Sequence, residues 1–306
     1  MANTKELRRR IKSVKNTAQI TKAMQMVSAT KMRRAQSQAM ASRNYTALLA
    51  HILSQASHKF AVLDHPLLKT AVLRINGSKK AGVILLSTDK GLCGSLNTNL
   101  IRVVQTAPEL TKYSDLVFYT VGRKGRDTMV RSQKILEADF PNQEKVEFVQ
   151  AVAIRRMVVE AFTTGQVGDV YLVYPHFIST LRQEPRIIKL LPISVEALED
   201  FLKLNSVTYL GGSSLLAQNG NGDFLFEPSI PQIIEYALIH FLDTQIYQAL
   251  LETKASEHSA RMMAMQNATN NAKDLVADLS LEYNQVRQSA ITTQILEIAS
   301  AGAALE

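Results

Sequence analysis

Glycine and proline are confined to the middle of the 306-residue chain, and this distribution limits the possible folds more than any other feature. All eight prolines and twelve of the thirteen glycines lie between Pro66 and Pro231, and the exception is Gly302. The two ends are rich in Ala, Met, Gln, Lys and Arg, which favour helices, and contain almost no helix-breaking residue. The distribution therefore predicts one helix over most of residues 3–58 and another over residues 232–300.

The two predicted helices are too long to be hidden inside an ordinary domain, at roughly 80 and 100 Å. In both, a stripe of residues recurs at alternating steps of three and four, which is typical of a left-handed coiled coil. The first stripe comprises Leu7, Ile11, Val14, Ala18, Thr21, Gln25, Ser28, Met32, Ala35 and Ala39. The second comprises Met262, Met265, Thr269, Ala272, Val276, Leu279, Tyr283, Val286, Ala290 and Thr293. Two amphipathic helices on a globular core are an alternative, although such helices rarely exceed about 25 residues.

Connectivity predicts how the helices run. The middle of the chain leaves the first helix near residue 65 and must return to the second near residue 231, so the helices should be antiparallel. This divides the chain into an N-terminal coiled-coil helix (1–65), a globular domain (66–231) and a C-terminal coiled-coil helix (232–306). The longer second helix should project beyond the first. Its last part, residues 288–306, is mostly apolar, has only Glu297 and Glu306 as charges, and would need an apolar sleeve.

The middle of the chain alternates short apolar runs with helical patterns. Buried strands are predicted at Val83–Ser87, Leu116–Val121 and Val170–Tyr174, a helix at Val146–Phe162 and an edge strand at Arg186–Leu191. This alternation is typical of an α/β domain with a mainly parallel, Rossmann-like sheet.

The formal net charge of +8 is concentrated at one end of the chain. Residues 1–43 hold eleven basic residues and a single acid, Glu6, whereas the remaining 263 residues hold 24 basic and 26 acidic ones. A coiled-coil nucleic-acid binder is therefore one hypothesis, but residues 1–43 contain no aromatic residue that could stack on bases. No apolar run approaches the roughly 18 residues that a membrane span needs.

The stretch STDKGLCGSLN, residues 87–97, follows a predicted strand and contains Cys93, the only cysteine. It lacks both GxGxxG and GxxxxGK[ST], so it gives no reason to expect a nucleotide. An enzyme that uses Cys93 as its nucleophile is a second alternative, yet no histidine follows it within forty residues. GRKGRD, residues 122–127, is predicted to be a solvated basic turn. The histidines lack metal-ligand spacing, so no catalytic, cofactor or metal site is predicted.

Three long stretches then point to a family. They are LRRRIKSVKNTAQITKAMQMVSATKMRRAQ at the start, STDKGLCGSLN in the middle, and SEHSARMMAMQNATNNAKDL followed by YNQVRQSAITTQILEIASAGAALE at the end. Together they closely resemble the gamma subunits of F-type ATP synthases, over the whole chain and in order. Two positions depart from the family pattern. Gln294 stands where the family usually has glutamate, and Ala301-Gly302 where it has Gly-Ala.

The resemblance implies a non-enzymatic rotor stalk. Such a subunit couples ion (proton) flow through the membrane ring to ATP synthesis or hydrolysis in the catalytic head by rotation. The implied partners are the alpha and beta subunits of the head, the regulatory epsilon subunit and the membrane c-ring. One copy per complex is implied, with no nucleic acid and no cofactor, peripherally bound on the cytoplasmic side of an energy-coupling membrane.

The resemblance also implies contact residues, by position. Those expected to face an acidic lever of the catalytic subunit are Lys22, Met24, Lys90 and Cys93. Those expected to engage the catch loop and head are Arg261, Arg287, Gln288 and Thr292. Those expected in a foot near the membrane ring and the epsilon subunit are Phe226 and Glu227.

Overall fold

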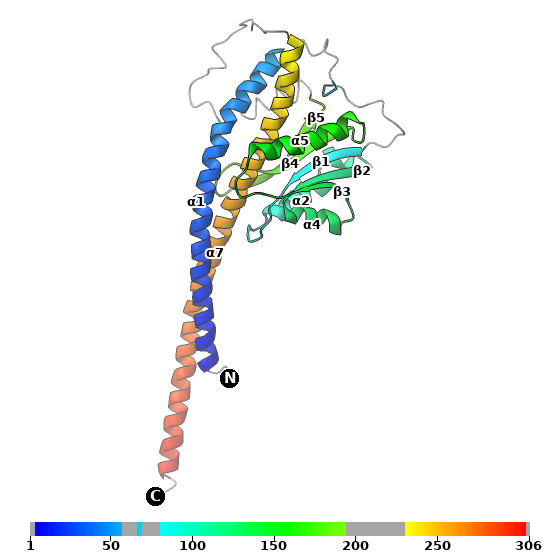
Figure 1. Ribbon diagram of the computed structural model, residues 1–306. Helices are drawn as coiled ribbons and strands as arrows, with labels where there is room; N and C mark the ends of the chain where they lie inside the picture. Colours follow the sequence, from blue (N-terminus) through cyan, green and yellow to red (C-terminus); the bar gives the residue numbers. More distant parts are fainter. Residues whose placement is uncertain (1–3, 57–65, 69–79, 194–229, 304–306) are drawn as a thin grey trace. The chain divides into compact units, whose positions relative to one another are not determined.

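Two long helices form the N-terminal and C-terminal parts of the chain. The computed structural model describes residues 4–56, 66–68, 80–193 and 230–303. Helix α1 spans Thr4–Ala56 and helix α7 spans Ile230–Ala303 (Figure 1). Both lie within three residues of the bounds predicted from the absence of glycine and proline.

The chain divides into two compact units. The first unit contains residues 1–30 and 261–306, and the second contains residues 31–260. The domain boundaries placed at residues 65 and 231 from the sequence stay a prediction, because residues 57–65 and 194–229 lie outside the described parts.

In the first unit, α1 and α7 pack as an antiparallel pair. The hydroxyls of Thr21 and Thr269 lie 2.7 Å apart, and the Gln25 side-chain amide donates to the side-chain oxygen of Gln266. Residue numbers rise along one helix as they fall along the other, so the helices run in opposite directions. Thr21, Gln25 and Thr269 belong to the predicted seam, and Gln266 lies next to it, which confirms the predicted antiparallel coiled coil.

The seam ends where α1 begins. All ten predicted seam residues of α1 are buried or half-buried, and so are those of α7 as far as Val286. The last two, Ala290 and Thr293, are exposed, as is every residue from Arg287 to Ser300. Among the described residues, no other helix pairs with this end of α7, as the difference in helix length predicted.

The second unit contains a five-stranded sheet. Its strands are β1 (Lys80–Leu86), β2 (Asp115–Val121), β3 (Ile135–Phe140), β4 (Asp169–Phe177) and β5 (Gln183–Leu191). They lie in the order β3-β2-β1-β4-β5, with the first four parallel and β5 antiparallel to β4. The predicted mainly parallel α/β sheet is confirmed, and β5 contains the predicted edge strand, whose antiparallel direction the sequence did not indicate.

Strand β3 was not predicted from the sequence. Its residues alternate between exposed and half-buried, and it includes Glu137 and Asp139, so it has no apolar run. It lies at the edge of the sheet, where one side of the strand has no neighbour. An edge strand of this kind needs little apolar surface, and the search for apolar runs therefore missed it.

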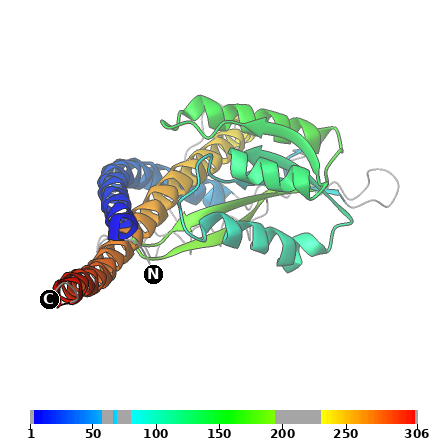
Figure 2. The same cartoon turned by 90° about the horizontal axis from the view of Figure 1, so that it is seen from below.

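Helices cover both faces of the sheet (Figure 2). Helices α2 (Leu96–Thr106), α3 (Pro108–Thr111) and α4 (Arg123–Arg131) share one core with Val83 and Leu85 of β1. Helix α5 (Phe148–Thr163) shares the other core with Ile84 and Leu86, together with parts of α1 and α7. Because neighbouring residues of a strand point to opposite faces, β1 contributes to both cores.

The prediction of a solvated turn at residues 122–127 was wrong. Residues from Arg123 begin α4, and the Gly125 amide donates to the Ser87 hydroxyl at 2.8 Å. A Cβ added at Gly125 would lie 2.7 Å from that hydroxyl oxygen, and one at Gly122 would lie 2.5 Å from the Ser87 carbonyl oxygen. Gly122 also has a positive φ of 94°. The two glycines allow the helix to approach the end of β1, which the spacing of basic residues did not reveal.

Candidate functional site

Lys22 and Met24 lie on α1 in the first unit. The Lys22 side chain is exposed, and its ammonium donates to the Gln25 side-chain oxygen at 3.2 Å. Met24 is half-buried. Gln25 in turn contacts Gln266 of α7, so the seam supports the turn of helix that presents Lys22. Lys22 is thus an accessible cation on a supported helix, and Met24 is only partly accessible.

The loop between β1 and α2 places Lys90 outside and Cys93 inside. Lys90 is exposed, whereas the Cys93 side chain is only 3% exposed. The Asn97 side-chain amide donates to Cys93 Sγ at 3.3 Å and to the Thr88 hydroxyl at 2.8 Å. Leu92, which has a positive φ of 63°, is exposed. Cys93 therefore helps to hold the loop in shape, while Lys90 and Leu92 form its outer surface.

The four residues expected to meet the head lie in two places on α7. Arg287, Gln288 and Thr292 are exposed, and the Thr292 hydroxyl donates to the Gln288 carbonyl oxygen at 3.0 Å. Arg261 is buried and lies 26 residues earlier, roughly 40 Å away along the helix axis. The structure does not bring Arg261 together with the other three. Phe226 and Glu227 lie outside the described residues.

The end of α7 exposes apolar side chains. Its exposed large apolar residues are Ile291, Ile295, Leu296 and Ile298. Within residues 287–300, Arg287 and Glu297 are the only charged residues. A helix with this much exposed apolar surface and no partner helix is typical of a segment that another protein encloses. Ile291, Ile295, Leu296 and Ile298 together form the apolar tip of α7.

An earlier part of α7, residues 241–259, is buried on nearly all sides in the second unit. All of these residues are buried except Tyr247 and His258, which are half-buried, and this stretch is called the enclosed segment below. It contains many polar residues, and a buried polar group must find a partner to avoid a large desolvation cost. The structure shows where several of these partners lie.

The partners come from the α/β domain. Asp243 accepts from the Arg155 guanidinium of α5 at 2.6 Å, and the Glu252 carboxylate lies 2.5 Å from His176 Nδ1 of β4. The Ser256 hydroxyl donates to the Pro175 carbonyl oxygen at 2.9 Å. These contacts fix α7 to both a helix and a strand of the domain.

Sequence reasoning missed these contacts, although a signal for some of them was present. Gln248, Glu252, Ser256 and Ser259 recur at steps of four, four and three, so they form a polar stripe on one side of the helix. Glu252 and Ser256 contact β4, and the Ser259 hydroxyl donates to the Thr180 carbonyl oxygen between β4 and β5 at 2.8 Å. The stripe predicts a polar neighbour, but it does not identify that neighbour.

The pKa values that folding shifts in the described residues all lie further from neutral pH than the ordinary values do. Burial, together with the charge of Glu137, raises the pKa of Tyr119 to about 12. Burial and a hydrogen bond to Asp169 raise the pKa of Tyr113 well above its ordinary value. The Lys31 ammonium, which contacts the Glu144 carboxylate, holds the pKa of that carboxyl below its ordinary value. Acid–base catalysis needs a pKa near the working pH, and none of these shifts supplies one.

The described residues contain no group of three or more His, Cys, Asp or Glu side chains that could hold a metal ion. They also contain no helix that is both long enough and apolar enough to cross a membrane.

Comparison with known sequences identifies close relatives over the full length. The family model described as ATP synthase matches residues 3–305. The chain is 41% identical over 308 residues to the ATP synthase gamma chain of Methylacidiphilum infernorum, with 98% of both chains covered. It is 39% identical over 307 residues to the ATP synthase gamma chain of Akkermansia muciniphila, with 100% of both covered.

Comparison with solved structures gives the same fold. A chain from the central stalk and c-ring structure of the Tetrahymena thermophila mitochondrial ATP synthase matches with a TM-score of 0.57 and 26% identity, over 81% of this chain and 99% of that one. A chain from the Euglena gracilis mitochondrial ATP synthase matches with a TM-score of 0.63 and 22% identity, over 99% of this chain and 94% of that one.

Proposed function

We propose how this chain works from one premise: it belongs to the family of ATP synthase gamma chains, the central-stalk subunits of these complexes. The chain acts as a non-catalytic shaft. By rotating, it couples ion flow through the membrane ring to ATP synthesis or hydrolysis in the catalytic head. The observation that supports this role most strongly is the apolar tip, where α7 continues past the end of α1 with its apolar side chains exposed.

The apolar tip fits inside the catalytic head. Burying each large apolar side chain there would contribute about 1.5–3 kcal/mol relative to leaving it in water. An apolar contact of this kind is non-directional, so it can hold the shaft in place without fixing one rotational position. The alpha and beta subunits of the head supply the sleeve, and Arg287, Gln288 and Thr292 contact it beside the apolar side chains.

Exposed basic residues face the acidic lever of the catalytic subunit. Lys22 and Lys90 are both exposed and can form ion pairs that screening keeps weak, at about 0–1 kcal/mol each. Weak pairs of this kind can form and release as the shaft turns, while the opposite charges still guide the contact. Met24 adds an adaptable side chain to this surface. Cys93 acts from inside its loop, by supporting the backbone that presents Lys90.

The remaining partners lie at the other end of the stalk. As part of a membrane-bound complex, the chain binds peripherally on the cytoplasmic side, beside the c-ring and the epsilon subunit. Phe226 and Glu227 belong to this foot. Arg261 is buried, so its main role is packing within the shaft and not contact with the head.

Reconstitution tests the proposal. The purified chain should hydrolyse no ATP alone, and should rotate when it is assembled with the alpha and beta subunits, fixed to a surface and supplied with MgATP. Ile295→Ser combined with Leu296→Ser should weaken assembly about tenfold or more, because two buried apolar contacts are lost.

The matched control combines Leu275→Ser with Leu281→Ser. These leucines are also exposed on α7, but they lie in the stretch that pairs with α1. The control should change assembly by less than about twofold, as expected of surface substitutions away from a contact. An equal loss in both double variants would show that the apolar tip has no special role. ATP hydrolysis by the purified chain alone would overturn the non-catalytic role.

A further inference from the structure

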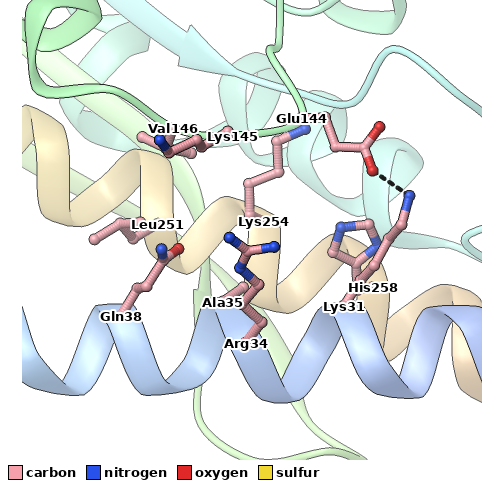
Figure 3. A pocket seen from close by; sticks show the side chains of 10 residues that line it. All are labelled: Lys31, Arg34, Ala35, Gln38, Glu144, Lys145, Val146, Leu251, Lys254 and His258. Carbon is pink, nitrogen blue, oxygen red and sulfur yellow. Dashed lines mark hydrogen bonds and ion pairs between the residues drawn. The ribbon is translucent and has the colours of Figure 1, made fainter.

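A pocket of about 170 Å³ lies in the second unit, between α1, α7 and the loop that leads into α5 (Figure 3). Its described lining residues are Lys31, Arg34, Ala35, Gln38, Glu144, Lys145, Val146, Leu251, Lys254 and His258. The three segments are far apart in the sequence, so only the folded chain forms this pocket. The proposed function does not use it.

The lining carries an excess of positive charge. Lys31, Arg34, Lys145 and Lys254 contribute four cations, whereas Glu144 is the only carboxylate among the described lining residues. Glu144 lies at the rim, where the Lys31 ammonium contacts it. The hydrogen bond from the Lys31 ammonium lowers the pKa of the Glu144 carboxyl most, and the charges of Lys90 and Lys254 lower it further. Glu144 therefore offsets one of the four cations, and the lining keeps an excess of positive charge.

One of the cations is a buried part of the wall. The Lys254 side chain is only 8% exposed, and its ammonium donates to the Asn142 carbonyl oxygen at 3.2 Å. It also lies 3.5 Å from a carboxylate oxygen of Glu257, which does not line the pocket. These contacts hold the ammonium in position from behind. A fixed, poorly solvated cation favours an anion more strongly than a mobile surface lysine does.

Arg34 provides a second cation of suitable shape. Figure 3 shows its guanidinium extending from α1 between Gln38 and Lys31, near the base of the Lys254 side chain, whose ammonium points to the loop before α5. A guanidinium is a planar fork of N–H donors that matches two oxygens of a phosphate or carboxylate. The apolar side chains of Ala35, Val146 and Leu251 also line the pocket and lower the local polarity. Charged donors beside apolar walls are a common arrangement for binding an oxyanion.

We propose that this pocket binds inorganic phosphate. Its volume of about 170 Å³ is enough for a tetrahedral anion and a few waters. Pockets that enclose ligands the size of a drug or a nucleotide start at about 300 Å³, so this pocket is too small to enclose a nucleotide. A dianion also balances more of the excess positive charge than a single carboxylate can. Bound phosphate would link α1, the loop before α5 and α7.

Phosphate binding to the purified full-length chain tests this inference. Inorganic phosphate is titrated at constant ionic strength, with chloride as the balancing salt, and its binding is followed by calorimetry and by broadening of the phosphorus NMR line. Arg34→Gln should weaken binding about tenfold, since it removes charge-assisted hydrogen bonds. Lys145→Gln should weaken it less, because this lysine is exposed and lacks the planar fork.

The matched control is Arg33→Gln. Arg33 is exposed on the same turn of α1 but does not line the pocket, and its substitution removes the same charge. Phosphate affinity should then change by less than about twofold, because an exposed charge outside the site is screened. Both arginines are exposed, so both variants should fold, and thermal unfolding without phosphate checks this. Lys254→Met should abolish binding in any fraction that folds.

Several results would overturn the proposal. One is the absence of saturable binding, and another is an equal loss of affinity in Arg33→Gln and Arg34→Gln. Tighter binding of glutarate than of phosphate would assign the pocket to carboxylates of a partner protein. Tighter binding of ADP, with loss in Arg34→Gln, would assign it to the phosphoryl group of a nucleotide. The test uses the chain alone, so its result does not depend on whether the chain rotates within a catalytic head.

Discussion

One helix, α7, meets two opposite environments along its length. Residues 241–259 are surrounded by the α/β domain and α1, and they contain buried polar and charged side chains with specific partners. Residues 287–300 pair with no other helix in the part of the chain that the structure describes, and they expose isoleucines and a leucine. The usual placement is reversed, with polar residues inside and apolar residues outside. Burial is therefore set by what surrounds each stretch of helix and does not follow from its composition.

The contrast indicates different tasks for the two stretches. The enclosed segment is held by directional hydrogen bonds and ion pairs, which require one particular geometry. The apolar tip offers only non-directional contacts, which a partner can meet in several orientations. Under the proposed function, the enclosed segment would serve as the firm attachment of the shaft and the apolar tip as its loose bearing.

The largest expected effect comes from breaking the buried ion pair in the enclosed segment. Asp243→Ala leaves the Arg155 side chain, which is only 15% exposed, without its carboxylate, and should lower the free energy of unfolding by about 3–5 kcal/mol. Urea unfolding of the purified chain measures the change. Asp278→Ala, at an exposed position on the same helix, is the control and should change it by less than about 0.5 kcal/mol. A loss below about 1 kcal/mol for Asp243→Ala would show that the pair is solvated.

The second prediction compares two leucines of α7. Leu238 is 0% exposed and belongs to the core that α7 shares with the sheet, so Leu238→Ala should cost about 2–5 kcal/mol of unfolding free energy. Leu296 is 63% exposed, so Leu296→Ala should change the stability of the isolated chain by less than about 0.5 kcal/mol. Calorimetric unfolding measures both. Similar losses at the two positions would contradict the contrast between core and tip.

The third prediction concerns the polar part of the seam. Thr21→Val removes the hydrogen bond between the hydroxyls of Thr21 and Thr269 and should cost about 1 kcal/mol. Adding Thr269→Val should recover part of this loss, because two apolar side chains then face each other.

Thermal unfolding of the single and double variants measures the coupling between these two threonines. Thr17→Val is the control, since the Thr17 hydroxyl is exposed and donates only within its own helix, to the Ser13 carbonyl oxygen. Additive effects of Thr21→Val and Thr269→Val would show that the two hydroxyls do not interact.

The smallest expected effect is a dependence on pH through an exposed ion pair. The folded chain lowers the pKa of Glu144 through Lys31, so the pair stabilises the fold above the unfolded pKa of about 4.3. This contribution is lost as the pH falls through the lowered pKa. Lys31→Gln should flatten this part of the curve of melting temperature against pH, whereas Lys15→Gln, at an exposed position of α1, should leave it unchanged. Identical curves for wild type and Lys31→Gln would refute the link.

Much of the fold could be predicted because it depends on local patterns. The absence of glycine and proline gave the helix bounds within three residues, and the apolar runs gave four of the five strands. Strand β3 was missed because an edge strand needs no apolar run. Helix α4 was missed because its first turn is basic and contains a glycine that approaches Ser87.

The candidate site was predicted less completely than the fold. Lys22, Lys90, Arg287, Gln288 and Thr292, expected as partner contacts, are exposed, but their contacts with the head stay a prediction. The sequence also placed Cys93 and Arg261 among the contact residues, but both side chains are buried. Burial of Cys93 depends on Thr88 and Asn97 folding around it, and no spacing rule indicates that arrangement.

The sequence by itself determined the two long helices, their seam and the apolar tip, because helix propensity and periodicity act between residues a few positions apart. Only the tertiary structure decided which stretch of α7 is enclosed, how Asp243 meets Arg155 and where the basic pocket forms. Asp243 and Arg155 are 88 residues apart in the chain. They pair only after folding brings them together and removes water, so a pattern over neighbouring residues cannot predict the contact.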